Sequence, residues 1–68
     1  MKLTMDVTQE RTGGWIAEVP ELPGVQGIGA TEDAATRAAR ALAFRVLADL
    51  LEIGELSDTM LHEVSFGE

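Results

Sequence analysis

Apolar and polar residues alternate over residues 3–8, at the start of the chain. Three apolar residues share one side of this segment: Leu3, Met5 and Val7. A period of two is typical of a half-buried strand, because successive side chains of a strand point to opposite faces. A polar loop that ends in two glycines follows, and residues 15–19 predict a second strand with Trp15 on its apolar face.

A rigid turn is predicted after the second strand, where both prolines of the chain lie. Proline fixes φ at about −65° and biases the preceding residue toward extended backbone, so this segment does not form a helix. The glycine after the second proline can adopt the positive φ that closes such a turn, and the leucine between the prolines is expected to act as an apolar plug. The motif residues, with the helix start that follows, are Pro20, Leu22, Pro23, Gly24 and Thr31.

A short third strand is predicted over residues 25–29, and a long helix from residue 32 to about residue 53. The glycines of the strand weaken its intrinsic preference and indicate a bulge or a close backbone approach. Thr31 suits the N-cap of the helix, and acidic residues follow it in the first turn. Gly54 is placed to end the helix in a left-handed cap.

The predicted helix carries apolar residues on two faces. One stripe has small residues first and large residues last: Ala35, Ala38, Ala39, Leu42, Val46, Leu50 and Ile53. A second group, Phe44, Leu47 and Leu51, lies well round the side. Two interpretations stay open for this group: scattered surface apolar residues, or an association surface. With Trp15, it is the candidate self-association or partner surface.

A final strand is predicted over residues 59–66, so the whole chain, residues 1–68, predicts one α+β domain of the order β-β-β-α-β. Short connections make the first three strands an antiparallel meander. A right-handed helical crossover then brings the fourth strand parallel to the first. The expected spatial order is third, second, first, fourth (3-2-1-4), with the helix on one face. The other face and the edge of the third strand need cover.

Length and charge limit the partners that the chain is expected to have. A core of 68 residues rarely supplies more than about 3–5 kcal/mol, and there is no cysteine for a disulfide or a thiolate zinc site. We therefore expect a second copy or another partner to supply the missing burial. The sequence shows no basic stripe that could bind nucleic acid. Its net charge of −7 favours a basic protein as the partner. No apolar signal core or membrane-length window is present in the sequence, which predicts a cytoplasmic location.

Candidate catalytic chemistry is weak. Asp6 and Glu63 are predicted on neighbouring strands, and a metal-dependent nuclease would need such a pair of carboxylates. His62, the only histidine, has no Ser, Cys or Asp at a motif spacing to orient it. Residues 27–29 lack the third glycine and the basic residue of a phosphate-binding loop. The sequence therefore predicts no enzyme, no catalytic residue, no metal and no cofactor.

The proline turn and the helix start each match a recurring motif. The first is Trp15-Ile16-Ala17-Glu18-Val19-Pro20-Glu21-Leu22-Pro23-Gly24-Val25, and the second is Gly29-Ala30-Thr31-Glu32-Asp33-Ala34. They resemble the HicB-like antitoxin family, which has an aromatic-x-Ala-x-x-Pro-Asp/Glu-Leu-Pro-Gly turn before a Gly-x-Thr-x-Glu-Ala helix start. Asp33 stands where the family usually has Glu. The resemblance covers residues 1 to about 66 and implies a partial RNase H-like fold.

The resemblance also implies a function. Members of this family neutralise HicA, a small basic mRNA-cleaving toxin, and many carry a C-terminal DNA-binding segment that is not present in this sequence. We therefore expect a stand-alone HicB-like antitoxin of a type II toxin–antitoxin pair, which self-associates and does not bind nucleic acid directly. The alternative is an orphan HicB-like oligomeric scaffold with no toxin partner.

Overall fold

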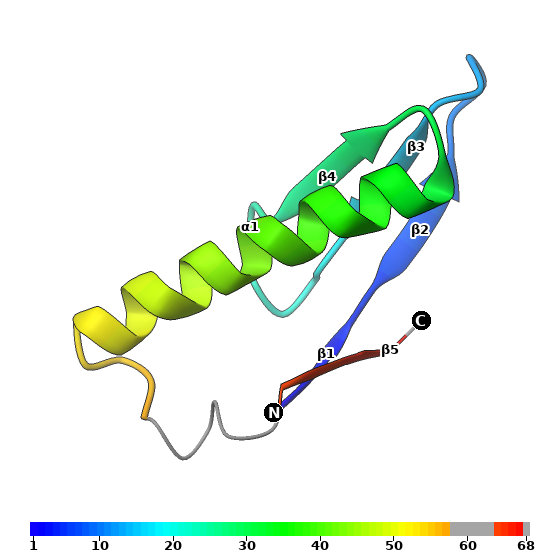
Figure 1. Cartoon of the computed structure of the whole chain (residues 1–68). Coiled ribbons are helices and arrows are strands. Elements are labelled where there is room, and N and C mark those ends of the chain that lie inside the picture. The colour runs from blue at the N-terminus through cyan, green and yellow to red at the C-terminus, as the bar shows by residue number, and fades with distance from the viewer. Residues whose placement is uncertain (58–63, 68) are drawn as a thin grey trace.

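The structure is a computed structural model of the chain, and it describes residues 1–57 and 64–67. The elements are β1 (Lys2–Thr4), β2 (Asp6–Gln9), β3 (Trp15–Glu18), β4 (Gln26–Gly29), α1 (Glu32–Glu52) and β5 (Ser65–Gly67) (Figure 1). The helix lies along one face of the strands, so the predicted α+β class is confirmed. Residues 59–63 of the predicted last strand lie outside the described residues.

The strands form two small sheets, so the predicted single sheet of order 3-2-1-4 is wrong. β2, β3 and β4 make an antiparallel sheet in that order, and β1 pairs with β5 in parallel in a separate sheet. The predicted first strand is divided at Met5, between β1 and β2. The division follows from the length of β3: its ladder with β2 ends at the pair Asp6–Glu18, just before Pro20 takes the chain out of the sheet.

The core lies between α1 and the strands. Leu3 and Met5 are buried and Val7 is half-buried, which confirms the alternation predicted for the first strand. Ala17 and Val19 are buried on the same side of the second strand. These side chains face the helix and make one continuous apolar cluster with it.

The buried stripe of α1 differs from the predicted one. Its buried residues are Ala35, Thr36, Ala39, Ala43 and Leu47. Ala35 and Ala39 of the predicted stripe are therefore confirmed as buried. The other predicted stripe residues are half-buried beside this line (Leu42, Val46 and Leu50) or exposed (Ala38 and Ile53). The helix has turned its small residues inward because it lies too close to β4 for larger side chains.

Two glycines of β4 permit this close approach. A Cβ atom at Gly27 would overlap backbone atoms of Ala35 and Ala39, and a Cβ atom at Gly29 would lie 2.7 Å from the Ala34 Cβ. β4 pairs with β3 in continuous register. Of the two interpretations of these glycines, the close backbone approach is therefore confirmed and the bulge is wrong.

Both ends of α1 are capped as predicted. The Thr31 hydroxyl accepts a hydrogen bond from the Ala34 N–H at 3.1 Å. Gly54 has a φ of 83°, and the N–H groups of Gly54 and Glu55 donate back to carbonyls in the last turn. This pair of hydrogen bonds is a Schellman motif, which satisfies carbonyls that a helix end would otherwise leave unpaired.

The two-proline segment forms the predicted rigid turn. The Leu22 N–H donates to the Val19 carbonyl and the Val25 N–H donates to the Leu22 carbonyl, each at 3.0 Å. Gly24 has a φ of 87°, and Leu22 is half-buried against the core. The positive φ and the apolar plug expected from the sequence are both confirmed.

Glu21 ties this turn to the start of the chain. Its carboxylate accepts the Thr4 N–H at 2.9 Å and the Thr4 hydroxyl at 2.6 Å. The hydrogen bond from the Thr4 hydroxyl, followed by that from its backbone, lowers the pKa of Glu21 below its ordinary value, because both stabilise the charged form.

We expect this contact to make stability depend on pH. A carboxyl whose pKa is lower in the folded chain stabilises the fold above its unfolded pKa, here 4.5, and loses that contribution as the pH falls through the folded pKa. Thermal unfolding at about pH 7 should therefore show the wild type more stable than Glu21→Gln, and the difference should shrink at about pH 3. Glu55→Gln is the control, because it removes an exposed carboxylate away from the Glu21–Thr4 hydrogen bonds. An equal difference between wild type and Glu21→Gln at both pH values would contradict the assignment.

Candidate binding surfaces

The four residues proposed from the sequence as a partner surface do not form one site. Trp15 lines a groove beside the first turn of α1. Phe44, Leu47 and Leu51 line a separate hollow. The groove lies at the N-terminal end of the helix and the hollow lies on its C-terminal half, so they are two distinct surfaces.

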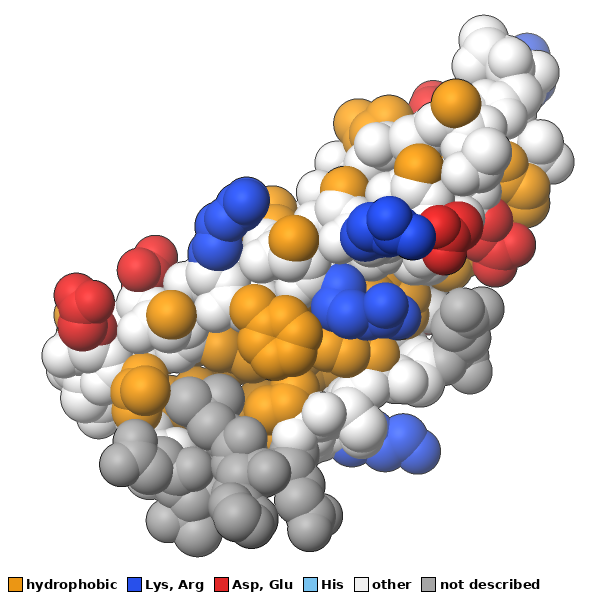
Figure 2. Space-filling view, viewed as in Figure 1, with side chains coloured by type: hydrophobic (Ala, Val, Ile, Leu, Met, Phe, Trp, Pro, Cys, Tyr) orange, Lys and Arg blue, Asp and Glu red, His pale blue; other side chains and the backbone are white. Residues whose placement is uncertain are grey.

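The hollow on the C-terminal half of α1 is apolar. It is lined by Phe44, Leu47, Ala48, Leu51 and Val64, and Figure 2 shows apolar side chains gathered beside the helix on this face. Phe44 is 49 % exposed and Leu51 is 36 % exposed, but Leu47 is only 2 % exposed. The prediction that Leu47 belongs to an exposed surface is therefore wrong, because the helix turns this residue into the core.

Phe44 also has a partner within the chain. Its ring meets that of Phe66 edge to face, with 5.7 Å between centroids and an interplanar angle of 71°. The Arg40 guanidinium lies 5.5 Å from the centre of the Phe66 ring. Aromatic and cation–π contacts of this kind hold β5 against α1. Phe44, one of the three apolar residues of the second helix face, is therefore partly explained by a contact within the chain.

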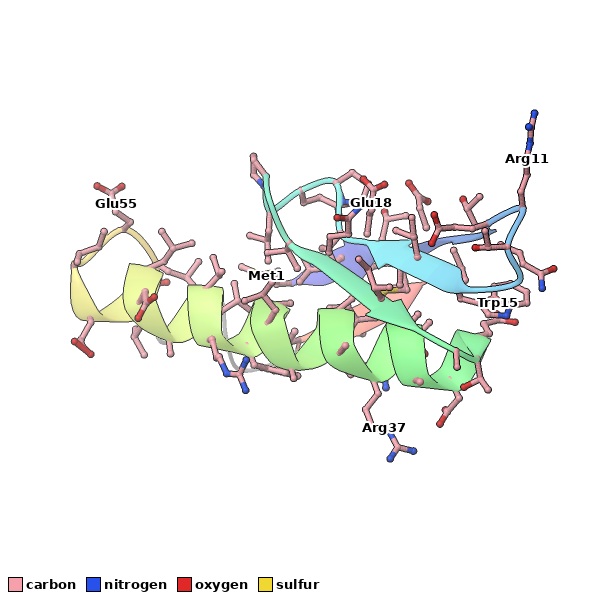
Figure 3. All side chains as sticks on the ribbon, turned by 90° about the horizontal axis from the view of Figure 1, so that it is seen from above. Met1, Arg11, Trp15, Glu18, Arg37 and Glu55 are labelled. Atoms are coloured by element: carbon pink, nitrogen blue, oxygen red, sulfur yellow. The ribbon has the colours of Figure 1, made fainter. Side chains whose placement is uncertain are left out.

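The face of the β2-β3-β4 sheet that points away from α1 is a third surface, which we name the outer sheet face. Because Ala17 and Gly27 are buried against the helix, their neighbours along the strands point outward. Figure 3 shows Glu18 directed away from α1. The strand register places two rows across this face, Asp6–Glu18–Gln26 and Thr8–Ile16–Ile28.

In the first row, two carboxylates lie opposite each other on adjacent strands. Asp6 and Glu18 are exposed and are register partners on adjacent strands. Side chains at such positions have Cβ atoms about 4.5–5.5 Å apart, and like charges there destabilise the pair. Neither carboxylate forms an ion pair within residues 1–57 and 64–67, where the salt bridge is Arg37–Asp33 on the helix. A cation from outside the chain would relieve this repulsion.

In the second row, two isoleucines lie opposite each other on adjacent strands. Ile28 is 66 % exposed, and its register partner Ile16 is half-buried. The alternation of residues 15–19 already places Ile16 and Glu18 on the face opposite Trp15. The pairing of these two residues with Ile28 and Asp6 required the strand register, which the sequence analysis did not assign.

Comparison with known proteins assigns no function to these surfaces. No family model, no curated protein and no solved structure matches this chain. The resemblance to the HicB-like family therefore stays a prediction that rests on the proline turn and the helix start.

The described part of the chain brings together no metal site. No group of three or more His, Asp or Glu side chains within it lies close enough to hold an ion. The nuclease alternative paired Asp6 with Glu63. Glu63 and His62 lie outside the described residues, and the carboxylate opposite Asp6 is that of Glu18. The same part of the chain contains no helix long and apolar enough to cross a membrane.

Proposed function

We propose that the chain is a non-catalytic binding module that covers a basic surface of another protein, as a HicB-like antitoxin would cover a small basic mRNA-cleaving toxin. The observation that carries this proposal is the outer sheet face. Opposed carboxylates lie beside opposed isoleucines there, so one partner can relieve the repulsion and bury the apolar side chains together. Asp6, Glu18 and Ile28 on this face are all exposed.

The physical chemistry favours a basic partner over a second copy on this face. A net charge of −7 attracts a basic protein over long range and speeds its encounter. A second copy docked here would bring two more carboxylates against Asp6 and Glu18. The isoleucines supply affinity, because full burial of one such side chain contributes about 1.5–3 kcal/mol.

A second candidate function is an oligomeric scaffold without a toxin. The observation that favours it is the apolar hollow on α1, where Phe44 and Leu51 remain partly exposed. In this proposal a second copy covers the hollow and supplies burial that a chain of this size needs. Self-association through the hollow is compatible with a toxin on the outer sheet face, since the two surfaces lie on different elements.

The test is co-expression with a small basic HicA-like toxin, taken from the neighbouring gene if that gene encodes one. Wild type should rescue growth and co-purify with the toxin, and Glu18→Lys and Ile28→Asp should each weaken the complex about tenfold or more, since 1.4 kcal/mol changes a dissociation constant tenfold. Glu52→Lys is the matched control, because it makes the same charge change on the helix and should keep rescue.

Three outcomes decide between the candidates. Absence of both rescue and complex would remove the antitoxin function. An equal effect of Glu52→Lys and Glu18→Lys would show that net charge acts without the outer sheet face. Light scattering of the chain alone that finds only monomers at micromolar concentration would remove the scaffold.

A further inference from the structure

β2 has one edge with no described strand beside it. The other edge of β2 pairs with β3. β5 pairs with β1, and its last register partner is Gly67 opposite Thr4. Within residues 1–57 and 64–67, the sheet hydrogen bonding therefore stops where β2 begins.

Hydrogen bonds at the start of β2 show which backbone groups point to this edge. The Met5 N–H donates to the Gly67 carbonyl, toward β5, whereas the Thr4 N–H donates to Glu21 on the opposite side. Successive N–H groups of a strand point to alternate edges. The N–H groups of Val7 and Gln9 therefore point to the same edge as that of Met5, where an added strand would find them.

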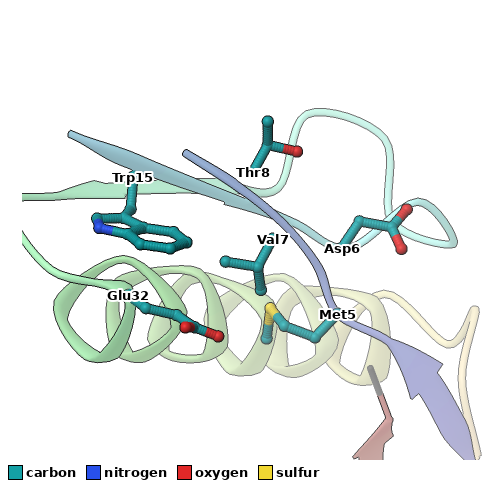
Figure 4. Close-up of a pocket in the computed structure, with 6 residues that line it drawn as sticks. All are labelled: Met5, Asp6, Val7, Thr8, Trp15 and Glu32. Carbon is teal, nitrogen blue, oxygen red and sulfur yellow. The ribbon is translucent and has the colours of Figure 1, made fainter. Parts of the chain in front are cut away.

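A groove lies directly beside this edge. It has a volume of about 530 Å³ and is lined by Met5, Asp6, Val7, Thr8, Trp15 and Glu32 (Figure 4). Figure 4 shows the Trp15 ring between the strands and α1, with Val7 beside it and Glu32 below it on the helix side. We name this space the β2-edge groove. Its size is in the range of binding clefts, about 300–1,000 Å³.

The lining of the β2-edge groove specifies what would fit it. Met5 is buried at its base, and Val7 and Trp15 are half-buried walls. The charged residues that line it are Asp6 and Glu32, both exposed and both acidic. An occupant therefore needs an extended backbone for the edge, an apolar side chain for the walls and a cation for the carboxylates.

We propose that the β2-edge groove binds an extended segment of a basic partner as an added strand on β2. Side chains of such a strand alternate. Those on the inner side pack between Val7 and Trp15, and those on the outer side carry arginine or lysine to Asp6, with a further cation at Glu32. Strand addition gives affinity through backbone hydrogen bonds and specificity through alternate side-chain pockets.

A second copy of the chain does not meet these requirements with either edge strand of its three-stranded sheet. β4 reads Gln-Gly-Ile-Gly and β2 reads Asp-Val-Thr-Gln, so neither offers a cation to the carboxylates, and β2 would add a further carboxylate. The proposal goes beyond the proposed function, because it names a second site, which shares only Asp6 with the outer sheet face, and a binding mode. It does not depend on a toxin as the partner.

The test uses a short synthetic peptide that alternates leucine and arginine, added to the full chain. Trp15 is the only tryptophan, so its fluorescence reports occupancy of the groove. We expect saturable binding with a spectral shift of Trp15, and slower hydrogen exchange at the Val7 and Gln9 amides. A peptide that alternates leucine and glutamate should bind at least about tenfold more weakly, because both lining charges are acidic.

Two variants separate strand addition from general charge attraction. Gln9→Pro removes an N–H that points to the outer edge and leaves the β3 side of the ladder intact, a position where a strand tolerates proline. It should weaken peptide binding about tenfold, whereas Gln9→Ala keeps the N–H and should bind as wild type does. Glu32→Lys should also weaken binding, and Glu55→Lys, the same charge change beyond the other end of α1, should not. Circular dichroism confirms that each variant is folded.

The outcomes also distinguish a failure of this proposal from a failure of the proposed antitoxin function. Peptide binding should persist in Ile28→Asp, which alters only the outer sheet face. Equal binding by Gln9→Pro and Gln9→Ala, together with equal binding by Glu32→Lys and Glu55→Lys, would overturn the proposal. A dissociation constant above about 1 mM for the arginine peptide would overturn it as well, even if toxin rescue is intact.

Discussion

Replacing Gly27 with alanine is expected to abolish the cooperative fold. The added methyl group would overlap backbone atoms of Ala35 and Ala39, in the helix segment that lies on β4. Backbone atoms inside a helix cannot move aside as a flexible side chain can, so α1 would have to leave β4 as a whole. Overpacking a core costs about 1–3 kcal/mol and occasionally more. A core of this size supplies only about 3–5 kcal/mol.

Thermal unfolding followed by circular dichroism measures this effect. Gly14→Ala is the matched control, because a Cβ atom there would lie 3.6 Å from its nearest neighbour, an ordinary contact, and its φ is not positive. It should unfold within a few degrees of wild type. If Gly27→Ala unfolds at the same temperature as Gly14→Ala, the close contact of α1 with β4 is wrong.

Leu47→Ala has the second largest expected effect. Leu47 is 2 % exposed and is among the largest fully buried side chains, with Met5 and Val19. Truncation of a buried leucine to alanine costs about 2–5 kcal/mol, which is close to all the stability that a domain of this size has. We therefore expect Leu47→Ala to be largely unfolded at 37 °C.

Leu51→Ala is the matched comparison, since it makes the same chemical change one turn further along α1. Leu51 is 36 % exposed, so its truncation removes less burial and should cost about 1 kcal/mol or less. Urea unfolding of both variants measures the difference. If Leu51→Ala loses as much stability as Leu47→Ala, a second copy or another surface buries Leu51, and the exposure seen in the single chain does not describe the protein in solution.

The binding surfaces were only partly predictable. Trp15 was singled out from the sequence, and it does line a groove. The residues that surround it there, Val7 and Glu32, come from segments far apart in the sequence, and no local pattern links them. The sequence pattern does not single out Ile28, because it stands between two glycines in a strand of weak intrinsic preference.

The sequence by itself determined the features that depend on neighbouring residues. The proline turn, the Thr31 cap, the Gly54 terminus and the alternation of the first strand all arise from interactions within a few residues, so their patterns are legible without a fold. For the glycines of β4 it left two interpretations open, a bulge or a close backbone approach, and the structure decided for the second.

Only the tertiary structure decided how these elements meet. The predicted stripe contained Ala35 and Ala39 together with the larger Leu42, Val46 and Leu50. The approach of α1 to Gly27 leaves room for alanine alone, so the two alanines are buried and the three larger residues are only half-buried beside them. The division of the first strand at Met5 has the same kind of cause, because it depends on where β3 stops beside it and on where β5 returns. Both are distances between segments remote in sequence, and periodicity carries no information about such distances.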